Sequence, residues 1–115
     1  MEYRHLGRTG LRVSEVALGA WLTLGSSVDR AATRELVQLA FDLGINLFDS
    51  ADVYASGEGE QALGEALREL PRQHLVLATK CFFPMSAHPN DRGLSRKHLF
   101  ESVEEIGRAS CRERV

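Results

Sequence analysis

Three side chains that could together transfer a proton lie near the ends of two apolar stretches of this chain. Asp49 closes the stretch at residues 45–50, Lys80 closes the stretch at residues 74–80, and Tyr54 follows Asp49 after one short loop. A free phenol, with a pKa of about 10, is a poor proton donor at neutral pH. A neighbouring ammonium lowers that pKa, and a carboxylate keeps the ammonium charged and oriented. Such a trio could protonate the oxygen of a ketone or aldehyde while hydride arrives from elsewhere.

The two stretches have the composition of buried parallel strands. Residues 45–50 (INLFDS) are entered through Gly44 and left through polar residues, and residues 74–80 (HLVLATK) form a second apolar run with β-forming residues. In barrels and open α/β sheets, the carboxyl ends of the strands face the ligand crevice. If the two stretches are neighbouring strands, all three side chains lie at one opening.

Each residue of the trio also has an ordinary structural explanation. A strand-end aspartate is often the cap of the next helix, a loop tyrosine is often a half-buried packing residue, and a lysine after a strand often lies in solvent. The occurrence of all three at consecutive strand ends favours a functional site over these separate explanations.

The remaining pattern predicts a hairpin followed by βα repeats. We expect the hairpin at residues 3–15, a first strand at 16–20, a first helix at 30–43 and a second helix at 59–70, ended by Pro71. Asp29 is the predicted N-cap of the first helix and Gly44 its C′ residue. A third helix begins near Ser95. The apolar residues expected to face inward are Leu36, Val37, Leu39, Ala40 and Leu43 in the first helix and Ala62, Leu63, Ala66, Leu67 and Leu70 in the second, while the third carries Leu99, Phe100 and Val103.

Several short motifs follow one another along the chain: residues 48–54 (FDSADVY), Gly57, Glu60, residues 63–64 (LG) and residues 78–80 (ATK), with residues 6–14 and 18–21 upstream. Through these motifs the chain resembles the aldo-keto reductases, a family of TIM barrels that reduce carbonyl compounds with NADPH. Residues 92–98 (RGLSRKH) resemble the branch that includes bacterial reductases and potassium-channel β subunits. The matching segments follow the family's order from the start of the chain to about Glu104.

The resemblance implies a role for each member of the trio. Tyr54 would be the general acid, Lys80 the group that lowers its pKa, and Asp49 the partner of Lys80. Ala20, Trp21 and Asp49 would lie beside the nicotinamide of NADPH, and the substrate would be a small carbonyl compound. An alternative is a nucleotide-binding regulatory subunit that resembles the potassium-channel β subunits.

The histidines are not expected to contribute to this chemistry. The family's fourth catalytic residue, a histidine or a polar substitute at the end of the fourth strand, has no counterpart here. The four histidines are His5, His74, His88 and His98. We interpret them as surface or structural residues, and since their spacing is not that of metal ligands, no metal site is predicted.

The length of the chain limits the predicted fold. A complete barrel needs about 250 residues, whereas the chain has 115. The predicted fold class is therefore α/β, the amino-terminal part of a (β/α)8 TIM barrel with an opening hairpin and about three βα repeats. Residues 1–104 would form this partial NADP-dependent oxidoreductase domain. Residues 105–115 resemble a translated sequencing-library adapter and are interpreted as a non-native tail.

A partial barrel of this kind is expected to be unstable and inactive on its own. Side chains of the barrel interior and a sheet edge would be exposed, and the phosphate sites of TIM barrels commonly follow strands seven and eight. We therefore expect this chain to bind NADPH weakly or not at all.

Composition excludes several other classes of protein. The apolar content of 43% and the charged content of 26% are ordinary for a soluble domain. The formal charge of −2 gives no indication of binding to nucleic acid or to a membrane surface. The two cysteines, Cys81 and Cys111, do not form a disulfide framework, and no signal peptide or long apolar run is present, which predicts a cytoplasmic protein. The oligomeric state is not predicted.

Overall fold

The computed structural model describes residues 1–21 and 23–110, which form a hairpin followed by three strand–helix units. The strands are β1 (Tyr3–His5), β2 (Arg12–Ser14), β3 (Leu18–Gly19), β4 (Leu47–Asp49) and β5 (Val76–Ala78), and the helices are α1 (Arg30–Asp42), α2 (Glu58–Leu67) and α3 (Arg96–Ser110). Two 3-10 turns, η1 (Tyr54–Gly57) and η2 (Arg72–His74), precede α2 and β5. All predicted elements are present, although each strand is shorter than the predicted stretch.

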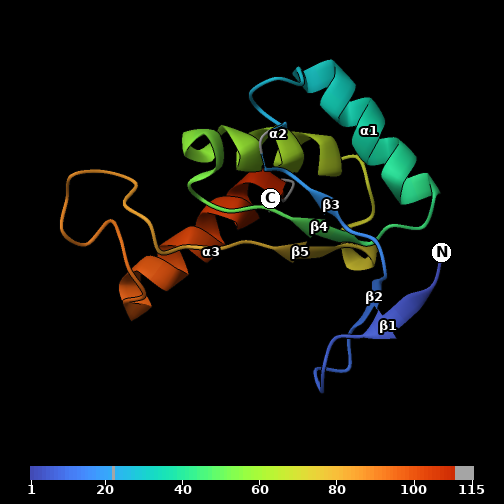
Figure 1. The fold of residues 1–115 in the computed structure, drawn as a ribbon, viewed down its shortest axis with the longest axis horizontal. Coiled ribbons are helices and arrows are strands. Elements are labelled where there is room, and N and C mark those ends of the chain that lie inside the picture. Colours follow the sequence, from blue (N-terminus) through green and yellow to red (C-terminus); the bar gives the residue numbers. More distant parts are fainter. Residues whose placement is uncertain (22, 111–115) are drawn as a thin grey trace, which may run out of the picture.

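Strands β3, β4 and β5 form one parallel sheet in that order. Leu18 pairs with Phe48, and Phe48 pairs with Leu77. Figure 1 shows the long loop after β5 at the carboxyl end of the sheet and the β1–β2 hairpin at its amino end. The prediction that residues 45–50 and 74–80 contribute neighbouring parallel strands is therefore confirmed, and Asp49 and Lys80 lie at the same end of the sheet.

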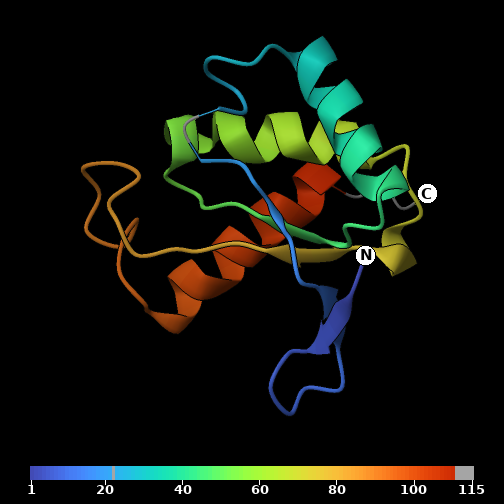
Figure 2. The ribbon, with the colours of Figure 1, turned by 45° about the vertical axis from the view of Figure 1, so that its right-hand side comes forward.

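The hairpin is attached to the amino end of β4 by polar contacts. The Asn46 side chain accepts a hydrogen bond from the Ser14 N–H at 2.8 Å and donates one to the Arg12 carbonyl at 3.0 Å. The Tyr3 hydroxyl donates to the Gly44 carbonyl at 2.7 Å. Figure 2 shows the hairpin projecting away from the three helices. These contacts fix the hairpin at the end of the sheet opposite to Tyr54 and Lys80.

Both ends of α1 have the residues that the sequence predicts. The Asp29 carboxylate accepts a hydrogen bond from the Ala32 N–H at 2.8 Å, as an N-cap does. Gly44 has φ +91°, a left-handed value that favours glycine. Its N–H donates to the Phe41 carbonyl and the Ile45 N–H donates to the Ala40 carbonyl, both at 2.9 Å, which is the Schellman arrangement. Gly44 therefore ends α1 and directs the chain into β4.

The apolar core lies between the sheet and helices α1 and α2. Phe48 in the middle of β4 is fully buried, and so are Val37 of α1 and Leu63 and Leu67 of α2. The prediction for α2 is confirmed, because Ala62, Leu63, Ala66 and Leu67 are buried and Leu70 is half-buried against the same core. Burial of these side chains holds the three strands in register.

The predicted inward face of α1 is partly wrong, because Leu36, Leu39 and the C-cap residue Leu43 are exposed. The apolar residues noted in α3, Leu99, Phe100 and Val103, are exposed as well. Val37 and Ala40 are buried as predicted, together with Thr33, and the buried residues of α3 are His98, Ser102, Ile106 and Ser110. The physical reason is that only a narrow stripe of each helix packs against neighbouring described elements, while most of the larger apolar residues lie on a side that residues 1–21 and 23–110 leave uncovered. Helix α3 also continues past Val103, the last residue of its predicted apolar pattern.

Helices α2 and α3 approach each other closely at Gly64. A Cβ atom at this position would lie 2.5 Å from the Ala109 carbonyl carbon and oxygen. One turn later, the Arg68 guanidinium donates hydrogen bonds to the carbonyls of Ala109 at 3.0 Å and of Arg108 at 3.4 Å. A side chain at Gly64 would therefore push α2 and α3 apart and would disturb the hydrogen bonds from Arg68 to the last carbonyls of α3.

In the 115-residue chain, we expect Gly64→Ala to destabilise the fold by about 1–3 kcal/mol, because the added methyl meets the Ala109 backbone, which cannot move aside alone. The matched control is Gly107→Ala, a second helical glycine, whose Cβ would meet nothing within 4 Å. The control should stabilise α3 by roughly 0.5–1 kcal/mol through helix propensity. Urea unfolding of both variants, followed by circular dichroism in a buffer with a stabilising osmolyte, measures the difference. Equal stability of the two variants would contradict the close packing.

Candidate active site

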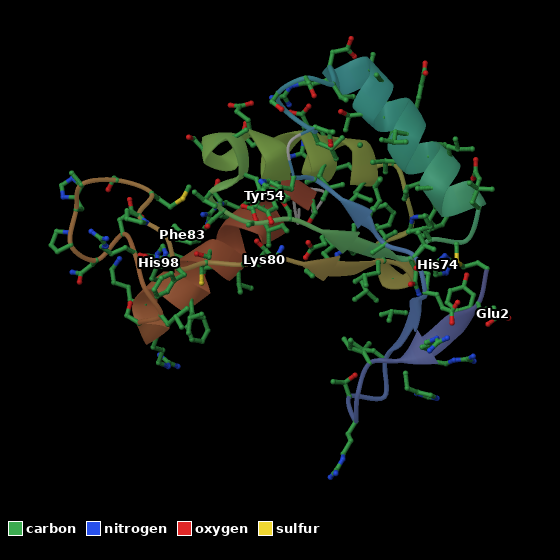
Figure 3. The ribbon with its side chains drawn as sticks, in the orientation of Figure 1. Glu2, Tyr54, His74, Lys80, Phe83 and His98 are labelled. Atoms are coloured by element: carbon green, nitrogen blue, oxygen red, sulfur yellow. The ribbon has the colours of Figure 1, made fainter. Side chains whose placement is uncertain are left out.

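The ammonium of Lys80 lies at the centre of the predicted trio. It donates a hydrogen bond to Asp49 Oδ2 at 2.8 Å, to the Ser50 carbonyl at 2.9 Å and to Tyr54 Oη at 3.4 Å. These three acceptors match the three donors of an ammonium group. Figure 3 shows Tyr54 and Lys80 close together near the carboxyl ends of β4 and β5. The structure therefore brings Asp49, Tyr54 and Lys80 into one cluster, and it adds the Ser50 carbonyl, which the sequence did not indicate.

The surroundings of Lys80 favour its charged form. Partial burial by itself lowers the pKa of Lys80, but the hydrogen bonds to Asp49 and Tyr54, together with the charge on Asp49, outweigh this and raise the pKa above its ordinary value. The side chains of Lys80 and Asp49 are 52% and 39% exposed, so solvent screens the ion pair and it adds little to stability. The arrangement therefore holds a cation beside a phenol at an opening to solvent.

Tyr54 begins a tight turn that is held in an uncommon backbone conformation. Its N–H donates to the Ala51 carbonyl at 3.1 Å. Ala55 and Ser56 follow with φ values of +50° and +54°, which are rare for residues with a side chain. Such conformations persist where the surroundings fix them, and they are frequent at functional sites.

An apolar cleft of about 560 Å³ opens beside the Tyr54 ring. Trp21 forms one wall, with its ring centroid 6.3 Å from that of Tyr54 and the two planes inclined by 24°. Trp21 is 65% exposed, whereas Ala20 is buried and its N–H donates to the Asp49 carbonyl at 2.8 Å. Phe83, on the loop after β5, also lines the cleft. The predicted cofactor-binding residues Ala20 and Trp21 thus lie next to the trio, and a planar or apolar group could bind against exposed aromatic surface here.

A buried carboxyl group supports the far end of the Tyr54 turn. Glu60 of α2 is 2% exposed, and its Oε1 accepts a hydrogen bond from the Thr79 hydroxyl, while Oε2 has no partner among the described residues. The pKa of Glu60 is raised above its ordinary value, mainly because burial disfavours the charged carboxylate. The hydrogen bond from Thr79 lowers the pKa, and the charges of Asp52 and Glu105 raise it. Sequence reasoning named Glu60 and the motif that contains Thr79 but did not predict their hydrogen bond, because it is a tertiary contact between α2 and the end of β5.

The histidines lie apart from the trio. Figure 3 shows His74 at the opposite end of the sheet from Tyr54 and Lys80, and His98 at the start of α3. His98 is 2% exposed, so it is a structural residue, which is one of the two predicted alternatives. Within residues 1–21 and 23–110, no group of three or more His, Cys, Asp or Glu side chains is arranged to hold a metal ion. None of the helices in these residues is long and apolar enough to cross a membrane.

Comparison with known proteins agrees with this geometry. The sequence model of the Aldo/keto reductase family matches residues 15–112, and this chain belongs to that family. A rice (Oryza sativa subsp. japonica) protein described as a probable voltage-gated potassium channel subunit beta is 46% identical over 105 residues, which cover 90% of this chain and 32% of that protein. An Arabidopsis thaliana protein with the same description is 43% identical over 106 residues, with the same coverage of 90% and 32%.

A solved structure extends the comparison to the fold. An aldo-keto reductase from Bacillus halodurans, in its holo form, has a TM-score of 0.78 and 31% sequence identity, and the match covers 96% of this chain and 36% of that one. The predicted fold class, the amino-terminal part of a (β/α)8 barrel, is thereby confirmed, and the described residues form no closed barrel. The chain spans about a third of the length of the curated relatives it matches.

The raised pKa of Glu60 predicts a pH dependence of stability. The folded state holds the proton of Glu60 more tightly than the unfolded chain does, so the free energy of unfolding falls as the pH rises above about 4.3, the ordinary value for glutamate. Glu60→Gln keeps a side-chain oxygen that can accept the Thr79 hydrogen bond, and it removes the pH-dependent loss of stability because glutamine does not titrate. We expect the variant to be at least as stable as the wild type at pH 7, with the difference shrinking toward pH 4.

Urea midpoints measured across this pH range test the effect. The matched control is Glu35→Gln on the exposed face of α1, which should follow the wild type at every pH. A Glu60→Gln variant that is less stable than the wild type at pH 7 would show that the carboxylate form of Glu60 supports the fold.

Proposed function

We propose that this chain is the amino-terminal part of an NADPH-dependent reductase of aldehydes or ketones. The observation that carries the proposal is the Lys80 ammonium, which lies 2.8 Å from a carboxylate oxygen of Asp49 and 3.4 Å from the Tyr54 hydroxyl at the carboxyl ends of two parallel strands. Membership of the Aldo/keto reductase family supports an oxidoreductase activity. The parent protein would act on small carbonyl compounds in the cytoplasm.

The proposed roles follow from the charges and contacts of the trio. Tyr54 donates its hydroxyl proton to the carbonyl oxygen of the substrate, and the nearby ammonium of Lys80 stabilises the phenolate that remains. Asp49 and the Ser50 carbonyl hold the ammonium in place, so that it needs no reorientation when the negative charge develops. The half-exposed position of Tyr54 at the cleft leaves its hydroxyl accessible to a small substrate.

The residues around the cleft fit the nicotinamide end of NADPH. When bound, this cofactor supplies the hydride for the carbonyl carbon. Trp21 offers an exposed ring against which a planar group can stack, and Asp49 offers carboxylate oxygens that can accept hydrogen bonds. Ala20 is buried and lines the same cleft as Trp21. These three residues are proposed to hold the nicotinamide beside Tyr54.

We expect Tyr54→Phe to lower kcat for a generic aldehyde by about 10²- to 10⁴-fold in the complete protein, the range typical of a lost general acid. The cofactor should still bind, because the ring and its contact with Trp21 remain. NADPH consumption, followed by its absorbance, and a fluorescence titration with NADPH measure the two effects. The matched control is Tyr3→Phe, the same chemical change in the hairpin far from the cleft, which should retain the wild-type rate. Full activity of Tyr54→Phe would remove Tyr54 from the chemistry.

The similarity to potassium-channel β subunits favours a second candidate function. The rice and Arabidopsis relatives carry that description and are 46% and 43% identical to this chain. The parent protein could therefore be a regulatory subunit that binds the nucleotide and associates with a channel. One assay of the complete protein separates the two functions: tight NADPH binding without turnover of several aldehydes and ketones would favour the subunit.

We further propose that the 115-residue chain lacks the cofactor's phosphate sites and that residues 105–115 are a non-native tail. The short coverage of the relatives supports the first point. The resemblance of the tail to an adapter supports the second, against which stands the family model's match as far as residue 112. A fluorescence titration of the isolated chain should give no saturable NADPH binding at micromolar concentrations, in contrast to the complete protein. Re-reading the source DNA past the codon for Glu104, from a template without ligated adapter, tests the tail; an unchanged reading through Val115 would refute it.

A further inference from the structure

A buried polar junction joins α3 to the loop that carries Tyr54, and the proposed chemistry makes no use of it. Asp52, on that loop, is 6% exposed, and His98 and Ser102, on the inward face of α3, are 2% and 6% exposed. Apolar side chains could pack at such a helix–loop contact without removing polar groups from water. The presence of a carboxylate, an imidazole and a hydroxyl at this contact therefore requires an explanation.

Both α3 residues converge on a single oxygen of Asp52. The Ser102 hydroxyl donates to Asp52 Oδ2 at 3.5 Å, and His98 Nε2 lies 3.7 Å from the same atom. Neither ring nitrogen of His98 makes a hydrogen bond within the described part of the chain, although both are buried. The Asp52 carboxylate is thus the group of the loop that α3 contacts, through one long hydrogen bond from Ser102 and through the neighbouring ring of His98.

The backbone of Asp52 connects this junction to the trio. Its N–H donates to the Lys80 carbonyl at 3.0 Å, and the next turn begins with the bond from the Tyr54 N–H to the Ala51 carbonyl at 3.1 Å. The 3.4 Å separation of Tyr54 Oη and Lys80 Nζ is at the long end of the hydrogen-bond range, so a small shift of the loop would break or tighten it. Movement of Asp52 therefore acts directly on the spacing of the proposed acid and its cation.

The uncommon conformation of the loop makes such support necessary. Ala55 and Ser56, directly after Tyr54, have left-handed φ values that the surrounding structure must maintain. On the downstream side the Thr79 hydroxyl holds Glu60. On the upstream side the side-chain attachment is that of Asp52 to α3. The contact of Asp52 with α3 therefore lies before the turn that carries Tyr54, and the contact of Glu60 with Thr79 lies after it.

We propose that Asp52, in contact with His98 and Ser102 of α3, is a positioning residue that sets the separation between the Tyr54 hydroxyl and the Lys80 ammonium. Asp52 does not touch the substrate; it acts through Tyr54. This assignment rests on the proposed reductase function, because the positioned pair is the proposed proton-donating unit.

The first test compares Asp52→Asn with Asp91→Asn in the complete protein. Asp91 lines the same cavity beside α3 as Asp52 does, so the control makes the same chemical change nearby. We expect Asp52→Asn to lower kcat by about 10- to 100-fold, as a displacement of roughly 1 Å does, with the Kd for NADPH within about twofold of the wild type. His98→Gln should lower kcat in the same way, and Asp91→Asn should leave it unchanged.

A double-variant cycle separates positioning from general destabilisation. If Asp52 acts through Tyr54, Asp52→Asn should have no further effect on the residual rate of Tyr54→Phe. An equal loss of rate in both backgrounds, or a wild-type kcat for Asp52→Asn, would overturn the proposal.

Hydrogen exchange provides a measurement that does not depend on turnover. Asp52→Asn should speed exchange of the amide protons of Asp52, Tyr54 and Ser56, whose hydrogen bonds define the turn, and should leave exchange in β4 unchanged. If the wild type shows no reductase activity, the proposed function fails, and faster exchange of these amides still supports the positioning of the turn. Unchanged exchange would overturn it.

Discussion

The arrangement of the whole site depends on one ammonium group that joins the ends of two strands. Lys80 follows β5, and its acceptors are provided by Asp49, Ser50 and Tyr54, which follow from the end of β4. The contact exists only because β4 and β5 are parallel neighbours in a fixed register, in which Asp49 pairs with Ala78. The buried Phe48 and the α2 residues packed with it maintain that register. The packing of the core therefore determines the geometry of the site.

The strands and the clustering of Asp49, Tyr54 and Lys80 could be predicted from the sequence because their signals are local. An apolar run that ends in a charged residue defines both a parallel strand and its functional end, so residue order alone places Asp49 and Lys80 at one edge of the sheet. The ends of α1 are equally predictable, because a cap at Asp29 and a left-handed glycine at Gly44 depend on residues within a few positions.

The contacts between elements could not be predicted in the same way. Periodicity identifies the apolar residues of a helix but not the neighbour that each side of the helix meets, so Leu36 and Leu39 are predicted to face inward and are exposed. The same limit applies to Glu60 with Thr79 and to Asp52 with His98, which are separated by 19 and 46 residues and meet only through folding. Small residues such as Gly64 determine how close α2 and α3 come, and small residues contribute little to an apolar pattern.

The attachment of the hairpin makes the two ends of β4 unequal. At the amino end, Asn46 binds the backbone of the hairpin, and at the carboxyl end, Asp49 and the cleft beside Tyr54 remain open to solvent. The amino end of β4 is occupied by the hairpin backbone, whereas a small molecule can approach Asp49 and Tyr54 without displacing any of the hydrogen bonds that Asn46 makes.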